Sequence, residues 1–245
     1  MVSVMTKNLA VLPFLLLSAC PDESICAQFV EPDPLFALSP AVWQWQNLQD
    51  RTIPVCWDQP STVSSDDQAL VRRIVEASWN VALDHESVSS MFRVRFVGWG
   101  PCVSGDAPGV HIVGWALNPS VSAIGARLDG KQAGVRLNMA LEACEDVATH
   151  EFCVRSQTVH EFGHVLGFVH EQNRPDTPSY CDEEPAGTDG DLMVGPWDLD
   201  SVMNYCNPLW SGHGHLSDGD IEGARFVYYP WLYERVFCPT DGGAP

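Results

Sequence analysis

Basic residues are scarce in this sequence. It contains 13 lysines and arginines against 32 aspartates and glutamates in 245 residues, which gives a formal net charge of -19. A surface of this kind repels the phosphate backbone of nucleic acids. We therefore exclude nucleic-acid binding, and we expect neutral or cationic partners to approach more easily than anionic ones.

Long hydrophobic runs are also missing, because no stretch after the N-terminus is long and apolar enough to span a bilayer. At the N-terminus, Lys7 precedes the run LAVLPFLLLSA, which is too short for a membrane span but typical of a signal-peptide core. Leu17-Ser18-Ala19-Cys20 resembles a bacterial lipobox. We expect residues 1–19 to be a signal peptide of the lipoprotein type and Cys20 to carry lipid, while an ordinary secretory peptide is the alternative.

That N-terminus predicts export. A lipidated Cys20 would tether the protein to a bacterial membrane surface, either in the periplasm or at the cell surface, without spanning the membrane. Without the lipid, the protein would be secreted.

The spacing C-x-x-C does not occur, which argues against a structural zinc site built from cysteines. Of the nine cysteines, eight remain if Cys20 is lipidated, an even number that could form four disulfides in an oxidising compartment. Eight cysteines allow about 105 pairings. We predict Cys144–Cys153, which are near neighbours, and Cys181–Cys206.

The hydrophobic pattern predicts a mixed α/β (α+β) domain. Residues 20–50 are interrupted by prolines and indicate a linker or N-terminal arm, and residues 51–245 form the domain. A polar loop covers roughly 172–198. The predicted elements are a strand at 52–57, a helix at 66–83, a half-buried strand at 92–96, strands near 109–115 and 134–140, and a helix at 218–228.

The segment HEFGHVLGFVH, residues 160–170, contains the candidate metal ligands and a candidate general base. His160 and His164 are four apart, so on a helix they share one face and can reach a single zinc ion. Glu161 lies at the edge of that face, where it can act as general base toward a zinc-activated water. Gly167 can end the helix in a left-handed conformation, and His170 then supplies a third ligand.

Three ligands leave one position of a zinc ion open, as in catalytic sites. A bare HExxH on a surface helix is the alternative, but the added glycine and third histidine favour the metal site. The remaining histidines are expected to lie at the surface or to be satisfied in the core. His213 and His215 share a loop without a carboxylate at ligand spacing, so a second ion there is disfavoured.

The segment HEFGHVLGFVHEQNRPD, residues 160–176, resembles the signature of the astacins, a subfamily of the metzincin zinc peptidases. Glu171, after the third histidine, is the astacin choice. Ser201-Val202-Met203-Asn204-Tyr205 is similar to the Met-turn. The resemblance implies a metzincin fold with a twisted mixed sheet, an active-site helix and a C-terminal subdomain. It also implies that Met203 forms an apolar floor beneath zinc. Tyr205 would be an additional zinc ligand at rest and would swing aside during the reaction to donate a hydrogen bond to the oxyanion.

Looser similarities extend from about residue 51 to 230. Residues 122–139 are similar to the edge strand and following segment that bind extended substrate in this family, which implies a substrate edge near 122–126. No inhibitory motif is recognisable between Cys20 and the domain. Two roles for Glu171 therefore stay open, an activation-linked contact and a local salt bridge with Arg174.

The resemblance implies a zinc-dependent endopeptidase that hydrolyses protein or peptide substrates. His160, His164 and His170 would bind Zn²⁺, with Glu161 and Tyr205 as catalytic residues. One alternative is a lipid-anchored binding or adhesion module in which zinc is only structural. Hydrolysis of a non-peptide amide is another.

Overall fold

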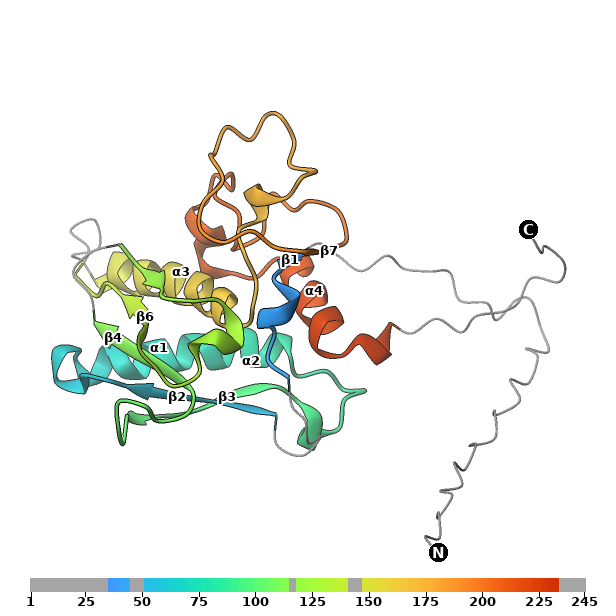
Figure 1. Ribbon diagram of the computed structural model, residues 1–245. Helices are drawn as coiled ribbons and strands as arrows, with labels where there is room; N and C mark the ends of the chain where they lie inside the picture. The colour runs from blue at the N-terminus through green and yellow to red at the C-terminus, as the bar shows by residue number, and fades with distance from the viewer. Residues whose placement is uncertain (1–34, 45–50, 115–117, 141–146, 234–245) are drawn as a thin grey trace, which may run out of the picture. The chain divides into compact units, whose positions relative to one another are not determined.

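The computed structural model describes residues 35–44, 51–114, 118–140 and 147–233 (Figure 1). The predicted signal peptide, Cys20 and Cys144 lie outside these ranges. No helix within them is both long and apolar enough to cross a membrane.

A twisted mixed sheet forms one layer of the described domain. Its strands lie in the order β3 (Arg95–Pro101), β2 (Thr52–Trp57), β4 (Val110–Gly114), β6 (Lys131–Leu137) and β5 (Ser120–Val121). The first four strands are parallel to one another, and β5 pairs antiparallel with β6 at the edge. This confirms the mixed α/β class.

The strand predicted at 52–57 matches β2, and β4 and β6 lie within or overlap the strands predicted near 109–115 and 134–140. The strand predicted at 92–96 starts later. A short 3-10 helix, η4 (Ser90–Phe92), precedes β3, and Val94 and Phe96 alone of the alternating apolar residues are fully buried.

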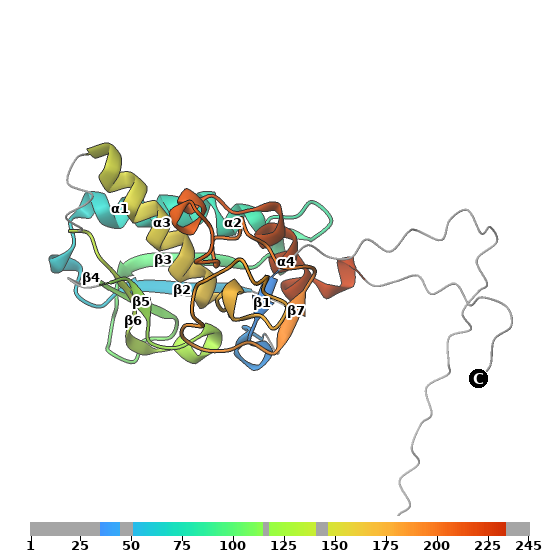
Figure 2. The same ribbon diagram turned by 90° about the horizontal axis from the view of Figure 1, so that it is seen from above.

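Two long helices cover one face of the sheet, α1 (Ser65–Ala77) and α3 (Val147–Val165) (Figures 1 and 2). Ser64 caps α1 by accepting a hydrogen bond from the Asp67 backbone N–H at 3.0 Å. The prediction of one helix over 66–83 was wrong, because the chain breaks at Ser78 and continues as α2 (Trp79–Ala82). The Ser78 hydroxyl donates to the carbonyl of Ile74, a local bond that competes with helix geometry.

The helix α3 runs through the middle of the core. Val159, Phe162 and Val165 are fully buried, and the Phe162 ring contacts Phe96 of β3 edge-on at 5.0 Å. Trp79 donates its indole N–H to the carbonyl of Val159, so α2 is tied to α3 just before the histidine motif.

Residues 35–44, which fall in the predicted N-terminal arm, pack within the described unit. Strand β1 (Leu35–Ala37) pairs antiparallel with β7 (Leu192–Val194), and η2 (Ser39–Ala41) follows β1. Trp43 donates its indole N–H to the carbonyl of Val165 at 2.7 Å. The segment therefore holds the end of α3 in place.

The polar loop predicted at 172–198 is mostly irregular but contains β7 and the end of η7 (Glu171–Asn173). The helix predicted at 218–228 is confirmed as α4 (Asp218–Tyr228). Ser217 and Asp220 form a reciprocal capping box at its start. The short helices η3 (Pro60–Thr62), η5 (Gly125–Leu128), η8 (Trp210–Gly214) and η9 (Pro230–Leu232) complete the described elements.

Two disulfides join described cysteines. Cys181–Cys206 confirms that prediction, and Cys56–Cys102 links β2 to the residue after β3. Cys153 is also disulfide-bonded. Its predicted pairing with Cys144 stays a prediction, since Cys144 lies outside the described ranges.

Candidate metal centre

The last two turns of α3 carry His160 and His164 on one face, as the spacing predicted. Their ring centroids are 4.8 Å apart, and both side chains are buried. The helix ends directly after this face, so the chain can turn back over it.

Gly167 makes that turn possible. Its φ of +99° lies in the region that glycine alone adopts without strain, and its N–H bonds the carbonyl of His164. A Cβ there would also stand 3.3 Å from the Cα of Val42. After this turn, His170 returns to face the two helical histidines.

The three histidines meet at their Nε2 atoms. His170 Nε2 lies 3.2 Å from His164 Nε2 and 3.3 Å from His160 Nε2. Two nitrogens held 2.0–2.1 Å from a tetrahedral ion lie roughly 3.3–3.4 Å apart. The spacing therefore fits a zinc-sized cation.

The other nitrogen of each ring fixes its tautomer. Each Nδ1 lies 2.7–2.8 Å from a backbone carbonyl, namely Val202 for His160, Phe168 for His164 and Ala186 for His170. A carbonyl oxygen can only accept, so each Nδ1–H donates and each Nε2 presents a lone pair.

Burial keeps these imidazoles neutral. It lowers the pKa of His160 to about 4, with a smaller effect from His170. Burial, followed by the charges of His160 and His170, also lowers the pKa of His164 well below its ordinary value. Burial likewise lowers the pKa of His170. Three neutral lone pairs that converge without a donor between them form a set that a metal ion satisfies.

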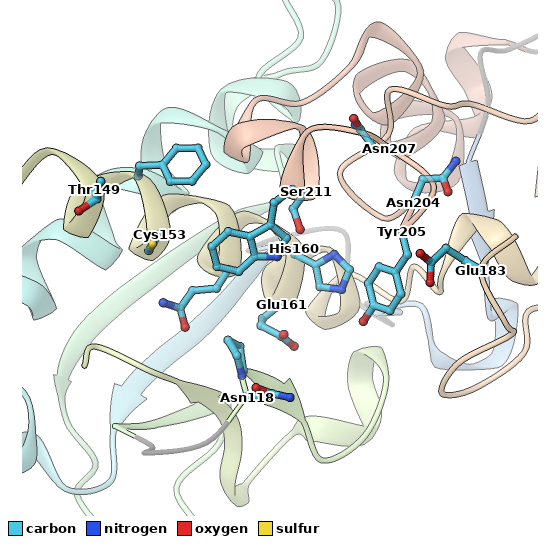
Figure 3. A pocket seen from close by; sticks show the side chains of 14 residues that line it. Asn118, Thr149, Cys153, His160, Glu161, Glu183, Asn204, Tyr205, Asn207 and Ser211 are labelled. Atoms are coloured by element: carbon cyan, nitrogen blue, oxygen red, sulfur yellow. The ribbon is translucent and has the colours of Figure 1, made fainter. Parts of the chain in front are cut away.

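Glu161 is buried beside His160, and both side chains line one cleft in the surface (Figure 3). Its Oε2 atom has no hydrogen-bond partner among the described residues, and burial raises the pKa of its carboxyl group to about 8. A divalent cation nearby would favour the carboxylate and lower this pKa. The carboxyl group can thus exchange a proton with a molecule bound in this cleft.

Met203 lies fully buried against α3, as the resemblance to a Met-turn implies. Gly163, the residue before His164, makes room for it, because a Cβ there would stand 2.3 Å from the Met203 Sδ. Asp220 of α4 anchors the segment 201–205 that carries Met203. Its carboxylate accepts hydrogen bonds from the Ser201 hydroxyl at 2.7 Å and from the Val202 N–H at 3.0 Å.

The Tyr205 ring covers the histidines from the open side. It stacks on His160 with 5.6 Å between centroids and lies 4.4 Å from the His170 ring. Burial, followed by the charges of Glu161 and Glu183, raises the pKa of its hydroxyl group to about 12. The hydroxyl group therefore stays a hydrogen-bond donor at neutral pH.

Glu171 forms the predicted local salt bridge. Its Oε1 atom lies 3.2 Å from Arg174 Nη1 and also accepts from the Asp198 N–H. Both side chains are buried. Burial raises the pKa of Glu171, whereas the charge of Arg174 lowers it, and Glu171 in turn raises the pKa of Arg174, as expected of a buried ion pair. The activation-linked role stays untested.

A cleft of about 670 Å³ opens beside the three-histidine group, and Figure 3 shows His160, Glu161 and Tyr205 facing it. Apart from these residues and the charged Glu183, the described wall of the cleft is uncharged and partly aromatic. The remaining lining residues are Asn118, Pro119, Thr149, Phe152, Cys153, Gln157, Asn204, Asn207, Trp210 and Ser211.

The other histidines lie apart from this group. His111 is fully buried between the Asp58 carboxylate and the carbonyl of Ala107, each 2.6 Å away. It also lies near Cys56 and Cys102, but these form a disulfide and are not free ligands. His213 packs edge-on against Phe152 at 4.9 Å.

Comparison with known proteins agrees with this geometry. Residues 121–186, which include the three histidines, match the model of the peptidase family described as Astacin. This segment is similar to the astacins. The chain shares the fold of the solved structure of myroilysin, with a TM-score of 0.54 at 17% identity over 79% of this chain and 98% of that one.

Two curated proteins align with parts of this chain. One is "Zinc metalloproteinase nas-36" of Haemonchus contortus, 35% identical over 81 residues, which is 27% of this chain. The other is "Zinc metalloproteinase nas-30" of Caenorhabditis elegans, 36% identical over 90 residues, or 31% of this chain. The alignments span 13% and 11% of those two proteins.

Sequence reasoning missed two residues that shape the site, Gly163 and Asp220. Gly163 stands inside the motif HEFGH, where any residue is allowed, and its role shows only when Met203 is placed against it. Asp220 lies in the first turn of α4, where the helix dipole alone is enough to favour an acidic residue. The capping signal Ser217-x-x-Asp220 was a clue, but the contact with the Met-turn is long-range.

Proposed function

We propose that this protein is a zinc-dependent endopeptidase. The observation that carries the proposal is the convergence of three Nε2 lone pairs from His160, His164 and His170, with every Nδ1 committed to a backbone carbonyl. The astacin-like segment and the names of the two aligned metalloproteinases support zinc as the metal.

In this proposal His160, His164 and His170 would hold Zn²⁺ beside the cleft, and three protein ligands are the number found in catalytic zinc sites. When bound, zinc polarises the scissile carbonyl and makes water a stronger acid. Glu161 takes the proton of the attacking water at its free carboxyl oxygen and then delivers it to the leaving amine.

Tyr205 stabilises the oxyanion. Its ring lies over His160 and His170, nearly half of the side chain is exposed to the cleft, and its hydroxyl group is a donor at neutral pH. A hydrogen bond to the developing charge is worth about 3–4 kcal/mol in comparable sites.

Protein or peptide substrates fit the edge of the sheet. The resemblance placed the substrate edge near 122–126, but the edge strand β5 ends at Val121 and η5 begins at Gly125. The Ser122 N–H still donates to the Gly134 carbonyl, so pairing with β6 reaches residue 122. An extended peptide would add to β5 through its backbone and place one side chain in the cleft.

We further propose export to an oxidising compartment, with Cys20 as a lipid anchor. The disulfides Cys56–Cys102 and Cys181–Cys206 support this location, because such bonds persist outside reducing compartments.

Hydrolysis of denatured casein tests the proposed function. The purified protein should cleave casein, lose activity with a chelator and regain it when zinc is returned. The zinc content of the same samples should fall and rise together with the activity. A protein that binds zinc but leaves casein intact would instead favour a binding module with structural zinc.

A further inference from the structure

A second hollow, of about 510 Å³, lies among α1, α2, α3 and α4, and we name it the basic groove. Figures 1 and 2 show α4 beyond the end of the main sheet, next to α2. Its lining holds four basic residues, Arg73, Arg155, His215 and Arg225, one acidic residue, Glu151, and the polar Ser78. None of these residues lines the cleft beside Glu161.

The charge of this groove runs against that of the whole protein. The sequence has only 13 lysines and arginines, yet three arginines line this one hollow. Glu151 is the sole acidic residue in its described lining. The groove is therefore a local basic site on a strongly acidic chain, where field lines from the three arginines concentrate.

Two of the arginines have donors to spare. Arg155 donates no hydrogen bond to any described residue, and its Nε atom is buried without a partner. Arg73 reaches only Glu151, at 3.9 Å, and both side chains are more than half exposed. A pair this long and exposed contributes little, so a better acceptor can replace it.

Arg225 plays a different part. It donates from Nε to the carbonyl of Ala82 at 2.8 Å and from Nη1 to Glu222 at 2.6 Å. The first bond ties α4 to the end of α2, and the second pairs Arg225 with a carboxylate of α4 itself, so its charge already has a partner. Arg73 and Arg155 are thus the cations that remain for a ligand.

Apolar side chains form the rest of the wall. Ile74, Val81, Leu216 and Ile221 line the groove, and Val81 is 60% exposed. A ligand that fits must therefore carry carboxylates and apolar groups together. Nucleic acid fits poorly, because its continuous negative charge would meet the acidic surface around the groove.

The groove also lies beside a segment that walls the cleft. Trp210 and Ser211 of η8 line the cleft, while Gly214 and His215 line the groove. Gly214 packs directly on Arg155, since a Cβ there would stand 2.5 Å from the Arg155 Cγ. A segment bound in the groove thus contacts the same stretch of chain as a ligand in the cleft.

We propose that the basic groove binds an acidic, partly apolar peptide segment of a protein partner, with its carboxylates on Arg73 and Arg155. This site is separate from the proposed peptidase activity. Fluorescence anisotropy with a labelled peptide of alternating leucine and aspartate tests it directly. The zinc-loaded full chain would carry Glu161→Gln, so that the probe stays intact whether or not the protein is a peptidase.

Saturable binding that weakens with salt is expected. The double change Arg73→Gln with Arg155→Gln should weaken binding about tenfold. Glutamine keeps the Cγ on which Gly214 packs, so the fold is preserved. Glu151→Gln should instead tighten binding, because it removes the acidic residue of the lining and frees Arg73.

Two controls separate the groove from general electrostatics. Arg95→Gln removes one exposed charge on β3 and should leave the affinity unchanged. A peptide of leucine and asparagine should not bind. The proposal is overturned if the wild-type groove shows no saturable binding, if the double variant binds as tightly, or if Arg95→Gln weakens binding equally.

Discussion

Gly163 and Met203 share a space that has no room for a single added methyl group. A Cβ on Gly163 would lie 2.3 Å from the Met203 Sδ and 3.3 Å from the Trp79 ring. The residue between Glu161 and His164 that the motif leaves free is thus fixed by the floor of the site.

Gly163→Ala should lower the free energy of unfolding by about 1–3 kcal/mol, the usual cost of overpacking a buried contact. It should also weaken zinc binding, because Met203 must shift beneath the histidines. Denaturant unfolding and zinc titration measure the two effects. Gly100→Ala is the matched control, since a Cβ there meets nothing within 4 Å. Equal behaviour of the two variants would remove Gly163 from this account.

Tyr205→Phe should keep the bound metal and lose about 10²–10³ of the rate, as expected for an oxyanion donor. The ring that stacks on His160 is retained and only the hydroxyl group is removed. Casein hydrolysis and metal analysis on one preparation measure both. Tyr180→Phe, which alters an exposed tyrosine against Trp197, should change neither. An unchanged rate in Tyr205→Phe would take the hydroxyl group out of the mechanism.

Asp220→Ala should destabilise the fold by about 2–4 kcal/mol. It leaves the buried N–H of Val202 and the partly buried N–H of Ser217 without their acceptor. Asp218→Ala is the control, because Asp218 lies in the same first turn but is exposed, so it should cost at most about 1 kcal/mol. Thermal unfolding of both variants is the measurement. A larger loss in Asp218→Ala would be inconsistent with the anchoring role.

Stability should also depend on pH through Asp220. Burial raises the pKa of its carboxyl group from 3.8 to about 6. Between these values the unfolded chain releases the proton first and binds fewer protons than the fold, so this group lowers the free energy of unfolding as pH rises. Asp220→Asn cannot titrate. The stability of the wild type relative to Asp220→Asn should fall from about pH 4 to pH 6. A relative stability that rises over this window would contradict the shift.

The sequence predicts the candidate site better than the fold around it. Local spacing was enough to bring the three histidines together, because a helix and one left-handed glycine determine their geometry. The break at Ser78 was not predictable from periodicity, since the apolar residues continue through it. The contacts of Gly163 and Asp220 join segments far apart in the chain, and no local pattern encodes them.

In the proposed mechanism, His160, His164 and His170 hold zinc and Glu161 moves the proton. Glu161→Gln tests it most directly, with zinc content and casein hydrolysis measured on the same sample. The account predicts the same zinc content as the wild type and a rate at least about a hundredfold lower. A variant that cleaves casein at the wild-type rate would contradict it.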